Sequence, residues 1–69
     1  MNNLYCVTLY DGKNNIVGSC YISSINEADA INDTDLLLSI HYPDIVYHHI
    51  DIELIETHYN ATSYFCFSS

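Results

Sequence analysis

One stretch of the chain, from Ser24 to His41, carries apolar residues at helical spacing, whereas the flanking segments alternate between apolar and polar positions. Glu27 follows Ser24 at the spacing of a capping box, in which each side chain satisfies the backbone N–H of the other residue. We therefore predict that a helix begins at Ser24. Pro43 disfavours helical geometry at Tyr42, which places the end of the helix close to His41.

The apolar residues of this helix are expected to form one stripe that packs on a sheet. They are Ile25, Ala28, Ile31, Leu37, Leu38 and Ile40. In the middle of the segment, Asn32, Asp33 and Thr34 are residue types that favour caps over helix interiors. Two arrangements remain open: one helix that is frayed or kinked near Asn32, or two short helices that join at Asp33. We favour the single helix.

Two strands are predicted before the helix. Leu4 to Tyr10 and Ile16 to Ile22 are rich in aromatic and β-branched residues, and they flank the turn-forming run Asp11 to Asn15. This pattern predicts a β-hairpin whose loop uses Gly12 or an asparagine where a positive φ is required. Gly18, inside the second strand, indicates a bulge or a close approach of the helix backbone.

Two further strands are predicted after the helix. Ile45 to Glu56 is the longest strand candidate, and its even-numbered face is expected to point inward. That face comprises Val46, His48, Ile50, Ile52 and Leu54. The segment from Asn60 to Ser63 is rich in turn formers, so it predicts a second hairpin that leads into a short final strand from Tyr64 to Phe67.

The order β-β-α-β-β indicates a single α+β domain over residues 1–69. We expect a three- or four-stranded, mainly antiparallel sheet with one helix packed on one face. With the third strand beside the first, the spatial order becomes 2-1-3-4. The alternative is a three-stranded sheet with a loose C-terminal segment. In either arrangement the second face of the sheet stays uncovered.

The charge of the chain restricts its partners. Nine acidic residues face a single base, Lys13, and the formal net charge is -8. Such a field repels phosphates, which argues against direct binding to DNA or RNA and against docking on an anionic membrane. A basic protein or nucleoprotein complex is the complementary partner. The alternative interpretation is that the charge only maintains solubility.

The uncovered sheet face is the predicted binding surface. Its expected contact residues are Tyr47, His49, Asp51 and Glu53, joined by outward residues of the first hairpin and supported by the helix acids Glu27, Asp29 and Asp33. Tyrosine contributes contact area while its hydroxyl stays hydrated, and adjacent carboxylates steer basic partners. The same acids could instead imitate the phosphates of a nucleic acid, or form an ordinary solvated helix face.

The sequence does not point to catalysis, to a metal or to a cofactor. His48 and His49 project to opposite faces of a strand, so they cannot readily share a metal ion, and the chain contains no CxxC pair. No glycine-rich phosphate loop and no local pairing of a nucleophile with a base is present. We therefore expect no enzymatic activity, no metal and no cofactor.

Three cysteines without the density of a secreted scaffold suggest reduced thiols and a cytoplasmic protein. A bridge between Cys6 and Cys20 across the first hairpin remains open. The N-terminus has no signal-peptide pattern, and no run of residues approaches the length of a membrane span.

The combination of a DGKNN turn, the helix start SSINEADAIND and the long strand IVYHHIDIELIE resembles small phage-encoded α+β proteins, including some anti-CRISPR inhibitors. The resemblance lies in size, charge and element order, and it transfers no functional residue. It implies a non-enzymatic inhibitor that acts in the cytoplasm of a host bacterium and occupies the nucleic-acid-binding surface of a defence complex. The many tyrosines favour a specific protein contact over generic phosphate mimicry. A homodimer that forms through an open sheet edge is the alternative.

Overall fold

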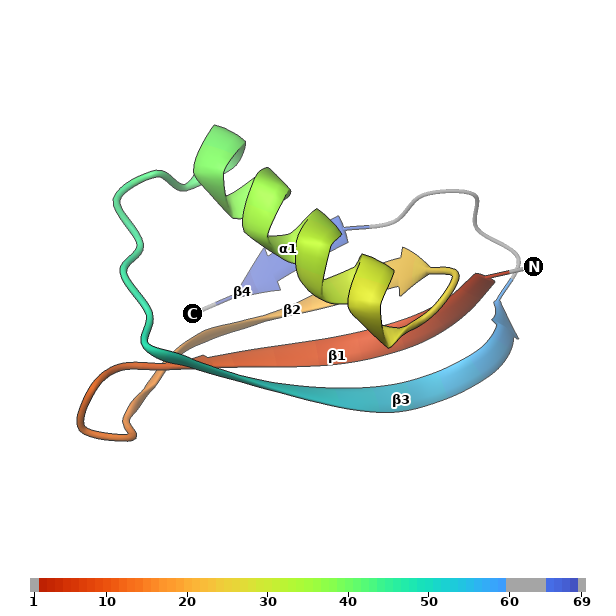
Figure 1. The fold of residues 1–69 in the computed structure, drawn as a ribbon, viewed down its shortest axis with the longest axis horizontal. Coiled ribbons are helices and arrows are strands. Elements are labelled where there is room, and N and C mark those ends of the chain that lie inside the picture. The colour runs from red at the N-terminus through yellow and green to blue at the C-terminus, as the bar shows by residue number, and fades with distance from the viewer. Residues whose placement is uncertain (1, 60–64, 69) are drawn as a thin grey trace.

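The four strands form one antiparallel sheet, and a single helix lies across one of its faces (Figure 1). The computed structural model describes residues 2–59 and 65–68. The elements are β1 (Asn2–Tyr10), β2 (Ile16–Ser24), α1 (Glu27–His41), β3 (His49–Tyr59) and β4 (Phe65–Ser68). The sheet order is β3-β1-β2-β4. The predicted α+β class, with one helix on one sheet face, is confirmed.

The first hairpin is confirmed, and its loop is organised by Asp11. The Asp11 carboxylate accepts hydrogen bonds from the backbone N–H groups of Lys13 (2.8 Å) and Asn15 (2.9 Å). These two bonds lower the pKa of the Asp11 carboxyl. Asn14 takes the positive φ, at 64°. Asparagine tolerates this left-handed conformation better than most residues, so the loop does not need a glycine there.

The register between β1 and β2 contains the bulge that Gly18 indicated. Pairing passes from Leu9 opposite Gly18 to Tyr10 opposite Ile16, which leaves Val17 as the extra residue.

The placement of the third strand is confirmed, but that of the fourth is wrong. β3 pairs with β1, as predicted, whereas β4 pairs with β2 at the opposite side of the sheet instead of forming a hairpin with β3. Beside β2, Phe65 and Phe67 pack against the core, and the Phe67 ring lies 4.8 Å from that of Tyr42. Burial of two aromatic rings favours this side. The turn predicted at 60–63 lies outside the described residues.

The predicted capping box is wrong. The helix begins at Glu27, and its N-cap is Asn26, whose side chain accepts a hydrogen bond from the Asp29 N–H at 2.9 Å. Ser24 still belongs to β2, where it pairs with Asn3, and it lies two residues before the N-cap. Its hydroxyl instead donates to the Asp33 carboxylate at 3.1 Å.

The helix runs unbroken through Asn32 to His41, so the two-helix alternative is excluded and the predicted end is confirmed. Tyr42 is the C-cap, and its N–H donates to the carbonyl oxygen of Leu38 at 2.8 Å.

The helix buries only part of the predicted stripe: Leu38 is buried and Leu37 packs against the core, but the other two buried positions, Ala30 and Thr34, lie outside it. Its buried residues are Ala30, Thr34 and Leu38, whereas Ile25 and Ile40 are 66% and 62% exposed. Ala28 is also exposed. The small side chains of Ala30 and Thr34 allow the helix to approach β2 closely, and hydrophobicity alone does not reveal such a row.

Thr34 is fully buried, and its polar group has partners. Its hydroxyl donates to the carbonyl oxygen of Ala30 at 2.7 Å and accepts from the Cys20 thiol at 3.8 Å. Facing it, the sheet contributes Tyr5, Val7, Leu9, Cys20 and Ile22 to the core. Because a buried hydroxyl without a partner would be costly, these two bonds explain how the core tolerates a threonine.

The third strand starts later than predicted, and the inward face of its first part is wrong. β3 begins at His49, and the preceding residues form a loop from the end of the helix. In that loop Ile45 and Tyr47 pack against the core while Val46 is 80% exposed. Strand alternation does not extend into a loop, so the even-numbered positions point inward only from Ile50 onward.

The open question of a bridge between Cys6 and Cys20 is settled by the register. Cys6 lies opposite Tyr21 and Cys20 lies opposite Val7, which places the two thiols on different faces of the sheet. Both are free, as is Cys66. Among the described residues, no helix is both long and apolar enough to cross a membrane.

The corrected helix start yields a prediction. Replacing Asn26 by Ala should lower the free energy of unfolding by about 1 kcal/mol, because the Asp29 N–H loses its acceptor. Asn26→Asp keeps an acceptor oxygen and should retain most of that stability. Urea denaturation followed by circular dichroism measures both variants. Equal stability of the Ala variant and the wild type would contradict the assignment of the cap.

Candidate functional site: the open face of the sheet

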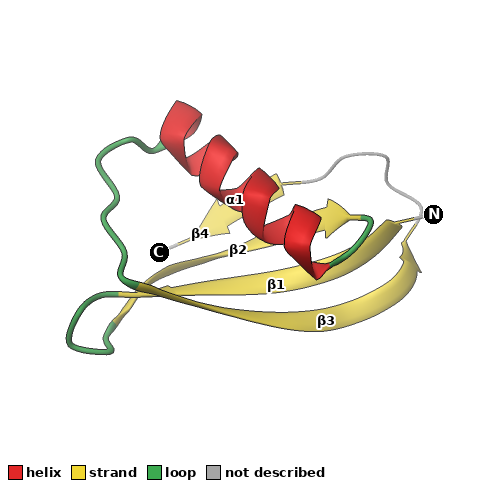
Figure 2. Ribbon diagram, in the orientation of Figure 1, coloured by secondary structure: helices red, strands yellow, loops and turns green. Residues whose placement is uncertain are grey.

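The helix covers one face of the sheet, and no other described helix or strand covers the opposite face (Figure 2). Residues directly opposite each other on paired strands share a face, so the register defines what this second face carries. Three adjacent rows cross the part of it that lies between His49 and Glu53 of β3. They are Glu53–Cys6–Tyr21–Cys66, Asp51–Thr8–Ser19 and His49–Tyr10. We refer to these nine residues as the open face.

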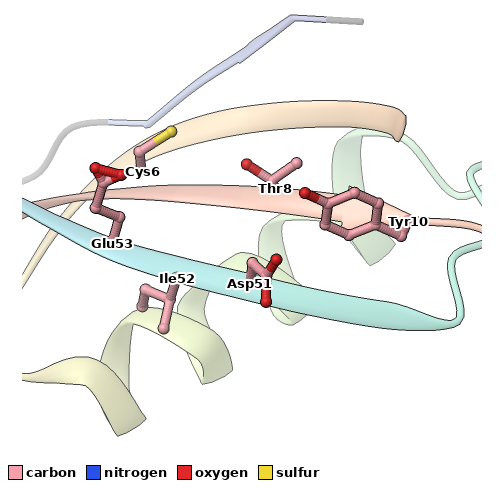
Figure 3. A pocket seen from close by; sticks show the side chains of 6 residues that line it. All are labelled: Cys6, Thr8, Tyr10, Asp51, Ile52 and Glu53. Carbon is pink, nitrogen blue, oxygen red and sulfur yellow. The ribbon is translucent and has the colours of Figure 1, made fainter. Parts of the chain in front are cut away.

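A shallow depression of about 390 Å³ lies on the open face, along the seam between β1 and β3. In Figure 3 the side chains of Cys6, Thr8 and Tyr10 rise from β1 on the side away from the helix, and those of Asp51 and Glu53 rise from β3 beside them. Ile52, between the two acids, points the other way, toward the helix. The depression is therefore bordered by two carboxylates on one side and by a phenol ring, a hydroxyl and a thiol on the other.

His49 links the acidic and aromatic parts of this surface. Its Nε2 lies 3.3 Å from Oδ1 of Asp51, and its ring centroid lies 5.7 Å from that of Tyr10. Both side chains of the His49–Asp51 pair are more than half exposed, so the pair adds little to folding stability. Its effect is to hold the Asp51 carboxylate and the Tyr10 ring in one continuous surface.

The carboxylates of the open face have no lysine or arginine beside them. The single base of the chain, Lys13, belongs to the exposed β1–β2 loop. Asp51 and Glu53 project from the same side of one strand at alternate positions, and both are exposed. Their charge is therefore available to a partner.

Tyr47 does not join this surface, so its predicted outward orientation is wrong. It lies in the loop before β3 and packs against the core on the helix side. Its hydroxyl donates to Oδ1 of Asp35 at 2.5 Å. Burial, and then the hydrogen bond and charge of Asp35, raise the pKa of Tyr47 to about 12. This tyrosine ties the loop to the helix.

The three helix acids are also separated from the open face, because α1 lies on the opposite side of the sheet. Glu27 and Asp29 occupy the first turn, where their charge interacts favourably with the helix dipole. Asp33 accepts a hydrogen bond from Ser24. The structure thus brings together His49, Asp51 and Glu53, and it places the other four predicted contact residues elsewhere.

The sequence prediction included the outward residues of the first hairpin but did not name the part that β1 contributes, namely Cys6, Thr8 and Tyr10. A pattern for it was present. Tyr5, Val7 and Leu9 alternate with these three residues and form the buried face of the strand. In a half-buried strand the intervening positions must face the other way.

The described residues contain no group of three or more His, Cys, Asp or Glu side chains that could hold a metal ion. The Cys20 thiol is buried in the core, and burial raises its pKa, which disfavours the reactive thiolate. The open face has the features of a contact surface: carboxylates, aromatic rings and hydroxyls on a flat sheet.

Comparisons with known proteins leave the function to be argued from this geometry. No protein-family model, no curated protein and no solved structure matches the chain.

The raised pKa of Tyr47 predicts a pH-dependent stability. Because the pKa is higher in the folded state than the ordinary value of 10.0, the contribution of this group is present below pH 10 and is lost as the pH rises toward 12. Tyr47→Phe removes the hydroxyl, so the wild type should be more stable than the variant at pH 8. The difference should shrink between pH 10 and 12.

Urea denaturation at several pH values measures that difference. Comparing the two proteins at each pH cancels the ionisation of the other tyrosines. A difference that stays constant from pH 8 to pH 12 would contradict the role of the hydrogen bond with Asp35.

Proposed function

We propose that this chain is a non-catalytic protein-binding module that docks its open face on a basic surface of a larger protein or nucleoprotein complex. The observation that carries the proposal is the arrangement of Asp51 and Glu53 on an uncovered sheet face beside Tyr10, His49 and Tyr21, with no lysine or arginine among them. This surface presents negative charge and aromatic area together.

Each component has a separate physical role in binding. The net charge of -8 attracts a basic partner over long distances and raises the rate of encounter. The tyrosine rings provide contact area at a low cost in conformational entropy once the surfaces meet. A complex of this kind should weaken as salt concentration rises, because part of its free energy comes from exposed charges.

An interface of ordinary size would use only part of the surface of the chain. A stable protein–protein contact covers about 800 Å² on each partner. The accessible surface of the chain is 4551 Å², so docking through the open face would use only a moderate fraction of it. The helix acids lie on the other side of the sheet and cannot touch the same flat surface, so they contribute to the field and not to this contact.

On the resemblance to small phage-encoded proteins, we propose a biological role for this binding. The chain is an inhibitor from a phage or mobile element, and its target is a defence complex or another nucleic-acid-handling complex of the host cytoplasm. The basic surface is then one that normally holds nucleic acid. Binding there would exclude the nucleic acid by occupying its site, without any chemical step.

A charge reversal on the open face tests the proposal. The tagged protein is used to capture complexes from bacterial lysate at low salt, and the retained proteins are identified after elution at high salt. The wild type should retain a basic or nucleic-acid-handling complex, and the Asp51→Lys/Glu53→Lys variant should lose at least nine-tenths of it. Both positions are exposed, so the variant is expected to fold.

The matched control reverses two charges on the helix, with Glu27→Lys and Asp29→Lys, and should retain the complex. If the open-face variant still captures the complex while the helix variant does not, the contact surface is the helix and the proposal for the open face is wrong. If no variant changes the retained proteins, the charge serves solubility.

A further inference from the structure

The outer edge of β3 is open for pairing. In the described sheet β3 pairs with β1 on one side only, and no strand lies on its other side. From His49 to Leu54 its register with β1 is regular, and irregularities begin only beyond Leu54. These six residues therefore present a regular run of backbone donors and acceptors along the edge.

The two sides of this edge differ sharply in chemistry. On the open face, His49, Asp51 and Glu53 present one imidazole and two carboxylates. On the helix side, Ile50 and Ile52 are only partly buried and Leu54 is 50% exposed.

The exposure of the helix side follows from the position of α1. The helix packs mainly over β2 and β1, so it does not extend across β3 (Figure 1). An apolar row and an acidic row thus run along one unpaired strand.

We propose that the partner inserts an extended segment that adds to the sheet as a fifth strand beside β3, with basic and apolar residues in alternation. This inference rests on the proposed function, since it names the part of the basic partner that the chain recognises. Basic side chains of the segment would lie on the open face next to Asp51 and Glu53. Its apolar side chains would lie on the helix side and cover Ile50, Ile52 and Leu54.

The alternation follows from strand geometry. Side chains directly opposite each other on paired strands lie about 4.5–5.5 Å apart at Cβ and share a face. A segment in which basic and apolar residues alternate can contact the acidic row and the apolar row while its backbone pairs with β3. A cluster of consecutive lysines can contact only the acidic row. Backbone pairing supplies affinity, and the side-chain alternation supplies selectivity.

A second copy of this chain fits the edge poorly. When β3 pairs antiparallel with itself about a two-fold axis at Asp51 or Glu53, identical carboxylates lie opposite each other. An axis at Ile52 places Asp51 opposite Glu53 of the copy.

An axis at Ile50 avoids these clashes, but the overlap is short and Leu54 stays uncovered. Like charges directly opposite each other are destabilising, and each copy carries -8. A partner strand of opposite charge avoids this repulsion in every register.

Synthetic peptides test the inference with the intact chain. The probe is an eight-residue peptide that alternates lysine and valine. One control has the same composition with its lysines and valines in separate blocks, and a second control is the alternating peptide with every other backbone nitrogen methylated. The alternating peptide should bind about tenfold more tightly than either control, because it alone keeps both the register and the backbone hydrogen bonds.

Calorimetry measures the affinities, and amide chemical shifts locate the site. The shifts caused by the alternating peptide should centre on residues 49–54. With Asp51→Lys/Glu53→Lys, the preference should switch to a peptide that alternates glutamate and valine. Equal binding of all three basic peptides would overturn the fifth-strand inference and leave docking through the open face intact.

Three further outcomes bear on this inference and on the proposed function. If none of the basic peptides binds although a basic complex is captured through Asp51 and Glu53, the inference fails and the proposed function stands. If the chain forms dimers whose contacts map to residues 49–54, a second copy occupies the edge and the inference fails. Loss of charge-sensitive capture altogether would remove the proposed function and the inference together.

Discussion

The single helix is too small to cover the whole face of a four-stranded sheet. This limit decides which parts of the sheet stay exposed. The helix packs closely through Ala30, Thr34 and Leu38, and this places it over β2 and β1. Fully buried residues of the sheet, such as Val7 and Leu9, lie beneath it. The strand beyond β1 and the whole opposite face remain accessible because no second element is present in the described chain to cover them.

The distribution of charge matches this geometry. The core contains no ionisable carboxylate, and its one buried hydroxyl in the helix is satisfied by Ala30 and Cys20. The acids are thus confined to the helix exterior, the loops and β3, where Asp51 and Glu53 belong to the open face. On the open face they stand beside tyrosine and histidine, which makes that surface chemically distinct from the merely hydrated outside of the helix.

The sequence predicted those parts of the fold that depend on local pattern. The first hairpin, the end of the helix before Pro43 and the position of β3 beside β1 follow from alternation, turn residues and chain order. What it missed depends on packing between distant segments. Thr34 is polar by composition, yet it is buried because it bonds to its own helix and fits against β2.

The same limit explains the partial prediction of the candidate site. His49, Asp51 and Glu53 share a face because they belong to one strand, so alternation was sufficient. Tyr47 lies just before that strand, and its side chain turns toward the helix to reach Asp35. The position of β4 could not be read from neighbouring sequence, because it depends on where Phe65 and Phe67 find a partly covered apolar surface.

The central claim is that binding occurs through the open face and the adjoining edge of β3. Amide hydrogen exchange, compared for the free chain and for the chain bound to a complex captured from bacterial lysate, tests it most directly. Binding should slow exchange in residues 49–54 and leave the exposed side of α1, including Glu27 and Asp29, unchanged. Protection confined to α1, with no change along β3, would contradict the claim.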